Sequence, residues 1–209
     1  MGLSCRVGVV DYGMGNLLSV RHALEMVGAD VSICRTPEEL DAVDRLVLPG
    51  VGAFGDCMKR LREAGLVEAL NDAVRRGARP ILGICLGMQA MASSSQEGGA
   101  HEGLGWFDAD VVRLEPASGL RVPQIGWNDV DYEPTSPLFR GLPPAPEFYF
   151  VHSYYMKCRT TACVDATCDY GGRVTAAVRR ENIVATQFHP EKSQDYGLKV
   201  LENFLRWNP

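Results

Sequence analysis

Residues 80–87 read PILGICLG, and this stretch decides the expected fold of the 209-residue chain. Its apolar first half predicts a short buried strand, and Gly-x-Cys-x-Gly predicts a sharp turn from that strand into a helix. Glycines flank such a turn because it leaves no room for side chains there. The turn would expose Cys85 at a helix N-terminus, which favours the reactive thiolate. A structural turn around a buried cysteine is the alternative interpretation.

Short strands and helices alternate on the N-terminal side of this turn. The expected strands cover residues 6–11, 30–34, 45–48 and 80–84. The expected helices are one capped by Asn16, one beginning at the capping box Thr36-Pro37-Glu38-Glu39, and one over residues 56–76 with an interruption near Gly65. This alternation predicts a mostly parallel central sheet flanked by helices on both faces.

The pattern changes after Trp106. Short alternating strands with turn signals such as Tyr170-Gly171-Gly172 predict an antiparallel extension of the sheet. A last helix is expected over about residues 193–207, where apolar residues gather on one side. No repeat or linker divides the sequence, so residues 1–209 are expected to form a single α/β domain.

Composition argues against several classes of function. The net charge of −5 disfavours nucleic acid or an anionic membrane as the main partner. No apolar run approaches the roughly 18 residues that span a bilayer, and Asp11 interrupts the only apolar stretch near the N-terminus. The seven cysteines are scattered and odd in number, which is typical of free thiols in a reducing compartment. We therefore expect a cytoplasmic protein.

The sequence predicts neither a metal site nor a cofactor. Cys158, Cys163 and Cys168 are regularly spaced but form no C-x-x-C pair, and no histidine lies beside them, so ordinary strand cysteines are expected. The segment Gly13-Met14-Gly15 lacks the third glycine of a dinucleotide fingerprint.

A second chemical motif, QFHPE, occupies residues 187–191. Residues two apart in an extended segment face the same side, so His189 and Glu191 are expected to be neighbours, and Pro190 favours that extended conformation. His189 would act as the base for Cys85, and Glu191 would hold its imidazole in the right tautomer. An isolated His-Pro-Glu is more typical of a solvated loop, but the two motifs together favour a Cys-His-Glu triad.

These motifs belong to an ordered set that resembles the class I, or triad, glutamine amidotransferases. The set is most similar to the HisH family, the glutaminase subunit of imidazole glycerol phosphate synthase, and it runs nearly end to end. Its members are DYGMGNL (11–17), LPGVGAFGD (48–56), GICLGMQ (83–89), GWN (126–128), FVHSYY (150–155) and QFHPEKS (187–193).

The resemblance implies a mechanism. Cys85 would attack the side-chain amide of glutamine, release ammonia and leave a thioester that water hydrolyses, with His189 as acid and base and Glu191 as its orienter. One oxyanion donor would be the N–H of Leu86. The other would come from the loop ending at Gly52, whose glycines let the backbone approach the substrate or reorient. Without the resemblance, that loop could equally be a plain turn.

The resemblance also implies how glutamine is bound. Gln89 and Glu97 match positions that hold the amino-acid end of glutamine, while Ser153 and Tyr154 lie on a strand expected to line the pocket. A carboxylate suits the substrate ammonium group. Glu97 could instead be a solvated charge, because it lies in the polar loop SSSQEGG.

A partner chain is expected, because free ammonia becomes ammonium, which is no nucleophile. The resemblance implies a (β/α)8-barrel synthase (HisF-like) that uses the ammonia to make imidazole glycerol phosphate in histidine biosynthesis. Residues matching regions that face the synthase are Asn16, Trp127, Tyr149 and Lys192. An exposed Asn or Lys in a loop is often only solvated, which is the alternative for these positions.

Two departures from the family pattern keep another function open. Val122-Pro123-Gln124 stands where the family has a Val-Pro-His run, and Ala90-Met91-Ala92-Ser93 replaces bulkier residues and an acidic one. The runner-up is a HisH-like paralogue supplying ammonia for amination of a surface-polysaccharide sugar. A γ-glutamyl hydrolase or cysteine peptidase would need no partner. A non-catalytic subunit would be expected to lack part of the triad, which is complete here.

Overall fold

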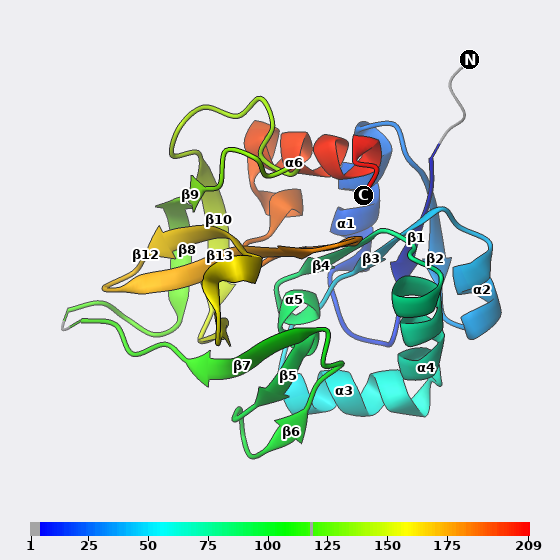
Figure 1. Cartoon of the computed structure of the whole chain (residues 1–209), viewed down its shortest axis with the longest axis horizontal. Helices are drawn as coiled ribbons and strands as arrows, with labels where there is room; N and C mark the ends of the chain where they lie inside the picture. The colour runs from blue at the N-terminus through cyan, green and yellow to red at the C-terminus, as the bar shows by residue number, and fades with distance from the viewer. Residues whose placement is uncertain (1–4, 118) are drawn as a thin grey trace.

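An eight-stranded sheet runs through the molecule, whose computed structural model describes residues 5–117 and 119–209 (Figure 1). Five neighbouring strands are parallel: β2 (Asp30–Cys34), β1 (Arg6–Val10), β3 (Arg45–Leu48), β4 (Ile81–Ile84) and β14 (Ile183–Thr186). Three antiparallel strands continue the sheet beyond β14: β13 (Arg173–Arg180), β12 (Val164–Asp169) and β9 (Asp131–Tyr132). The prediction of a mostly parallel sheet with an antiparallel extension is confirmed.

Two smaller sheets lie beside the large one. The first pairs β8 (Gln124–Asp129) with β10 (Glu147–His152) in antiparallel register, so that Trp127 faces Tyr149 across the strands. The second has the order β11 (Tyr154–Cys158), β7 (Phe107–Arg113), β5 (Ala92–Ser95) and β6 (His101–Glu102). The chain passes from β10 to β11 through Ser153, so both small sheets meet beside this residue.

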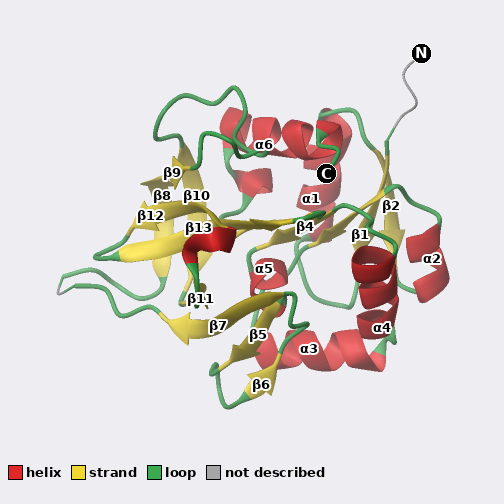
Figure 2. Ribbon diagram, in the orientation of Figure 1, coloured by secondary structure: helices red, strands yellow, loops and turns green. Residues whose placement is uncertain are grey.

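Helices cover both faces of the large sheet, as Figure 2 shows. On one side lie α1 (Leu17–Met26) and α6 (Gln194–Arg206), and on the other lie α3 (Phe54–Glu63), α4 (Leu66–Leu70) and α5 (Leu86–Ala90). The remaining helical segments are α2 (Pro37–Asp41), the π-helical turn Asn71–Arg76, and the 3-10 turns Thr161–Cys163 and Pro190–Lys192. Among the described residues, no helix has the length and apolar character needed to cross a membrane.

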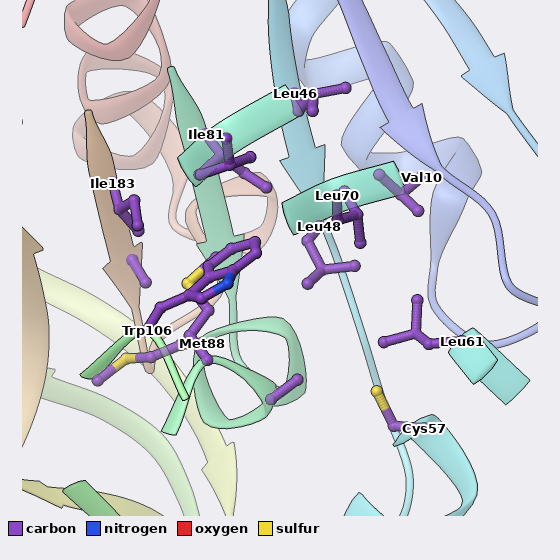
Figure 3. Packing of buried hydrophobic residues seen from close by; sticks show 14 of the residues in the cluster. Val10, Leu46, Leu48, Cys57, Leu61, Leu70, Ile81, Met88, Trp106 and Ile183 are labelled. Carbon is purple, nitrogen blue, oxygen red and sulfur yellow. The ribbon is translucent and has the colours of Figure 1, made fainter. Parts of the chain in front are cut away.

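Side chains that alternate along the central strands pack into two separate hydrophobic cores, because successive side chains of a strand point to opposite faces. On β3, Leu46 and Leu48 pack with α3 and α4, whereas Val47 packs with α1 and α6. Figure 3 shows part of the first core, in which Leu61, Leu70 and Trp106 lie near the strand residues. Burial on both faces explains why these strands are continuous apolar runs.

The caps and boundaries of the early helices agree in part with those expected from the sequence. The capping box at α2 forms, since the Thr36 N–H donates to Glu39 Oε2 at 3.2 Å. Gly65 separates α3 from α4 with a φ of 67°, as its position in the sequence predicted. The expectation that Asn16 caps α1 is wrong in detail: the helix begins at Leu17, but the Asn16 side chain makes no capping hydrogen bond.

Candidate active site

Cys85 sits at the tip of the predicted strand-to-helix turn, between the end of β4 and the start of α5. Its φ of 53° and ψ of −108° are unusual for a residue with a side chain, and such strain is concentrated at functional sites. A Cβ on Gly87 would lie 1.8 Å from the carbonyl oxygen of Leu48, and one on Gly83 would lie 2.7 Å from Met91 Cε. Glycine is therefore required at position 87, as the sequence predicted, whereas at position 83 the flexible end of Met91 can move and the tight neighbour is the Met88 backbone nitrogen at 3.0 Å.

His189 and Glu191 form a buried pair. His189 Nδ1 lies 2.7 Å from Glu191 Oε1, and their side chains are 2% and 1% exposed. The expected contact is present, but the expected reason is wrong in part. His189 is extended, whereas Pro190 to Lys192 form a 3-10 turn, so Glu191 reaches the ring by a turn of the backbone instead of strand alternation. Ser193 Oγ braces the turn by donating to the His189 carbonyl at 2.7 Å.

The imidazole of His189 is electrostatically tuned by its two neighbours. Burial alone would lower its pKa, but the Cys85 sulfur and the Glu191 carboxylate outweigh burial and raise the pKa to about 9. Because Nδ1 is held by Glu191, Nε2 is the ring atom free to exchange a proton. Among the described residues, Nε2 is buried and has no hydrogen-bond partner within ordinary distance.

A cavity of about 400 Å³ opens beside Cys85 and brings the sequence-predicted residues together. Its lining includes Gly52, Leu86, Gln89, Glu97, Ser153, Tyr154, Cys85 and His189, together with Val51, Pro123, Val151, His152 and Lys192. A cavity of about 560 Å³ elsewhere is lined by Trp127, Glu147 and residues 193–196, and neither Cys85 nor His189 borders it. The cavity with the buried nucleophile and base is therefore the candidate active site.

Hydrogen bonds between side chains and the backbone fix the loops around this cavity. The Tyr12 hydroxyl donates to the Pro49 carbonyl at 2.9 Å, which anchors the loop leading to Gly52. Gly52 has a φ of 107°, a conformation that favours glycine. Two residues after Gly52, the Phe54 N–H donates a hydrogen bond to Glu97 Oε2 at 2.8 Å, so this carboxylate is held at the start of α3. Glu97 is thus an ordered part of the cavity wall.

Three of the four residues expected at a partner surface lie together. Trp127 is 45% exposed and meets Tyr149 edge to face, with ring centroids 6.0 Å apart. Lys192 Nζ lies 6.0 Å from the centre of the Tyr149 ring and also borders the active-site cavity. Asn16 is exposed before α1 and lines neither of the two cavities described above.

Two polar residues of the site were quoted in the sequence motifs without a role. His152 borders the cavity, and its Nδ1 lies 2.9 Å from the Tyr154 carbonyl. Burial lowers the His152 pKa to about 4, so the ring is neutral at physiological pH. Its Nε2 is buried and has no partner among residues 5–117 and 119–209. Gln187 is fully buried, and its Nε2 lies 3.6 Å from Cys85 Sγ. Gln187 lies two residues before His189, and residues two apart in an extended segment face the same side, so this spacing could have indicated that Gln187 belongs to the site.

The departure from the family pattern at Gln124 lies next to the cavity. Gln124 is buried, begins β8 directly after the cavity residue Pro123, and faces His152 across the strands. Within the part of the chain that the structure describes, its Oε1 has no hydrogen-bond partner. Throughout residues 5–117 and 119–209, no group of three or more His, Cys, Asp or Glu side chains is arranged to hold a metal ion.

Comparisons with known proteins give a consistent result. A family model described as glutamine amidotransferase class-I matches residues 8–207. The imidazole glycerol phosphate synthase subunit HisH 1 of Campylobacter jejuni is 46% identical over 200 residues, covering 96% of this chain and 99% of that protein. Subunit HisH of Brucella abortus is 46% identical over 215 residues, covering 98% and 100%. PurLQS of Thermotoga maritima has a similar fold, with a TM-score of 0.75 at 22% identity over 98% of this chain and 99% of that chain.

Proposed function

Because this chain belongs to the HisH family of class-I glutamine amidotransferases, we propose that its Cys85, His189 and Glu191 hydrolyse glutamine to glutamate and ammonia. The observation that carries the proposal is a single cavity containing both Cys85 and the His189 ring, whose other nitrogen is held 2.7 Å from Glu191. A nucleophile, a base and an orienting carboxylate in this order are the parts needed for covalent acyl transfer.

The chemistry follows from the charges of the triad. His189 takes the Cys85 proton, and the resulting imidazolium is stabilised by the sulfur and by Glu191, which raise the His189 pKa to about 9. The sulfur then attacks the side-chain carbonyl carbon of glutamine, and His189 protonates the amide nitrogen as the C–N bond breaks and ammonia leaves. A water molecule, deprotonated by His189, hydrolyses the thioester to glutamate and restores the thiol. Glu191 fixes the tautomer throughout and does not itself take the proton.

The oxyanion formed on the substrate needs donors that are present before the reaction. We assign these to the N–H groups of Leu86, which starts α5 directly after the nucleophile, and of the loop ending at Gly52. The amino-acid end of glutamine is assigned to Glu97 and Gln89, and Ser153 and Tyr154 belong to the same cavity lining. Glu97 can accept from the substrate ammonium group while it holds the Phe54 N–H, because a carboxylate offers about four lone pairs.

The ammonia passes to a separate chain in this proposal. The relatives are named as subunits of imidazole glycerol phosphate synthase, which supports a (β/α)8-barrel, HisF-like synthase as the partner and histidine biosynthesis as the pathway. The partner surface is assigned to the cluster of Trp127, Tyr149 and Lys192, and Asn16, exposed before α1, is assigned to it as well. The chain would act as one domain over residues 1–209 in the cytoplasm. Amination of a polysaccharide sugar is not favoured, because these relatives carry the synthase name.

The test measures glutamate release from glutamine by this chain alone, with the barrel synthase of the same organism, and with that synthase plus its ribulosyl substrate. Strong stimulation by the complete mixture is expected. Turnover that the synthase and its substrate leave unchanged would contradict the proposed partner. The absence of glutamate in every mixture, with a partner shown to be active on free ammonia, would contradict the glutaminase assignment.

A further inference from the structure

Two glutamine side chains form a hydrogen-bonded relay that ends at the nucleophile. Gln187 Nε2 donates to Cys85 Sγ at 3.6 Å, and Gln187 Oε1 accepts from Gln89 Nε2 at 3.1 Å. Gln89 Nε2 also donates to the main-chain carbonyl of Tyr154 at 2.8 Å. The relay joins the start of β11, helix α5 and the segment after β14, three parts of the chain that are distant in sequence.

The Tyr154 carbonyl sets the direction of every bond in this relay. A carbonyl oxygen can only accept, so Gln89 must present its NH2 group to it. The same NH2 group also faces Gln187, so Gln187 must accept this hydrogen bond with its side-chain oxygen. That leaves the NH2 group of Gln187 for the Cys85 sulfur. The amide next to the nucleophile is thus a donor, because rotating it by half a turn would break the relay and place the NH2 groups of the two glutamines against each other.

Backbone hydrogen bonds on both strands hold Gln187 next to the sulfur of Cys85. The Cys85 N–H donates to the Thr186 carbonyl at 2.8 Å, which continues the parallel pairing of β4 with β14 up to the nucleophile. The Gln187 N–H is bound to the Ala176 carbonyl at 2.8 Å. The next residue, Phe188, is stacked on Phe148 with ring centroids 4.0 Å apart. Gln187 is consequently fixed from both sides and fully shielded from water.

We propose that Gln187 is a further catalytic residue, whose amide N–H stabilises the thiolate of Cys85 and is aimed by Gln89 and the Tyr154 carbonyl. A hydrogen bond donated to a charged group favours the charged form, and it is stronger in a site that excludes water. The inference rests on the proposed function, because it concerns the nucleophile of the same reaction. It adds a neutral donor to the triad and leaves the roles of His189 and Glu191 unchanged.

The relay also connects the substrate pocket to the sulfur. Gln89 and Tyr154 border the cavity in which glutamine is assigned, and both hold the donor in place. The Cys85 proton moves to His189 Nε2, and Gln187 keeps both of its protons throughout. When the sulfur becomes part of a thioester it loses its charge, so the Gln187 contact weakens. The contact strengthens again when hydrolysis releases the thiolate.

The test follows the rate at which iodoacetamide alkylates Cys85 as a function of pH, read from the mass of the peptide that contains it. Gln187→Met removes the donor at nearly constant shape, and Gln187→Glu replaces it with a carboxylate. The matched control is Asn203→Leu, because Asn203 is also a buried amide, with Nδ2 bonded to the Leu138 and Arg140 carbonyls at 2.8 Å, and it belongs to α6. Thermal unfolding of each variant measures how much stability the substitution removes.

Gln187→Met is expected to slow alkylation at pH 7 about tenfold and to move the midpoint of the profile upward, with Gln187→Glu shifted further. Asn203→Leu should keep the wild-type midpoint despite its lower unfolding temperature. Equal midpoints for wild type and either Gln187 variant would overturn the proposal, as would an equal shift in the control. If one Gln187 variant does not fold, the other decides. Alkylation needs neither glutamine nor the synthase, so this outcome is separate from the test of the proposed function.

Discussion

Nδ1 of His189 lies 2.7 Å from Oε1 of Glu191, and the two side chains are 2% and 1% exposed. The contact holds one imidazole tautomer, in which Nε2 faces the nucleophile. It also contributes to the raised pKa of His189, which favours a thiolate–imidazolium pair over a neutral thiol and imidazole.

Glu191→Gln is expected to lower kcat by roughly two to four orders of magnitude with little change in KM. The amide can donate where the carboxylate accepts, so it permits the wrong tautomer while preserving the shape of the site. Steady-state kinetics of glutamate release in the complete complex measure both constants. A defect confined to KM would show that Glu191 acts in substrate binding and does not orient His189.

Cys85→Ala is expected to reduce glutamine-dependent synthesis by at least about 10³-fold, because no other group can form the thioester. Synthesis from added ammonium salt by the same complex should remain at the wild-type rate. Both rates are read from formation of the product by the synthase. Loss of the ammonia-dependent rate as well would mean that Cys85 supports the structure of the complex.

Folding stability should fall at alkaline pH through His189. Its pKa of about 9 in the folded protein exceeds the usual value of 6.5, so the stabilisation is full below pH 6.5 and is lost as pH rises through 9. The change is on the order of 3 kcal/mol. Urea unfolding from about pH 6 to about pH 10 measures it. Cys85→Ala should show a shallower decline, since only Glu191 then raises the pKa. Identical declines in stability for the wild type and Cys85→Ala would show that the sulfur does not raise the His189 pKa.

Gly87→Ala is expected to destabilise the fold by about 3 kcal/mol or more and to abolish glutaminase activity, since its Cβ would lie 1.8 Å from the Leu48 carbonyl oxygen. The control is Gly65→Ala, where φ is 67° but, apart from the two adjoining residues, none of the described residues has an atom within 4 Å of the new Cβ. That substitution should cost only about 1–2 kcal/mol and leave activity intact. Chemical denaturation compares the two. Equal costs would mean that the turn can open to admit a side chain.

Trp127→Ala should weaken binding of the barrel synthase roughly 10- to 100-fold, because exposed aromatic side chains commonly anchor protein interfaces. Leu120→Ala is the control, since Leu120 is equally exposed, at 45%, and lies near Gly171 at the turn between β12 and β13. Titration calorimetry gives both dissociation constants. An unchanged affinity for Trp127→Ala would exclude this surface as the main contact. A similar loss for both variants would indicate a general effect of surface truncation.

The sequence by itself determined the features that depend on neighbouring residues. Apolar runs buried on both faces predicted the parallel strands, and the glycines around Cys85 predicted the turn, because local sterics leave few alternatives. The proximity of His189 and Glu191 was predicted as well, although a 3-10 turn and not an extended strand produces it. The first helix was placed correctly, but the side-chain cap expected from Asn16 does not form.

Only the tertiary structure decided which distant groups meet at the sulfur. The pairing of β4 with β14 brings Gln187 to Cys85, 102 residues away, and the packing of α5 against β11 brings Gln89 to Tyr154. No local pattern encodes these contacts, since strand order and register result from the fit of the two cores as a whole. The sequence therefore determined the reactive groups and their immediate backbone, whereas long-range packing determined the direction of the hydrogen bonds around them.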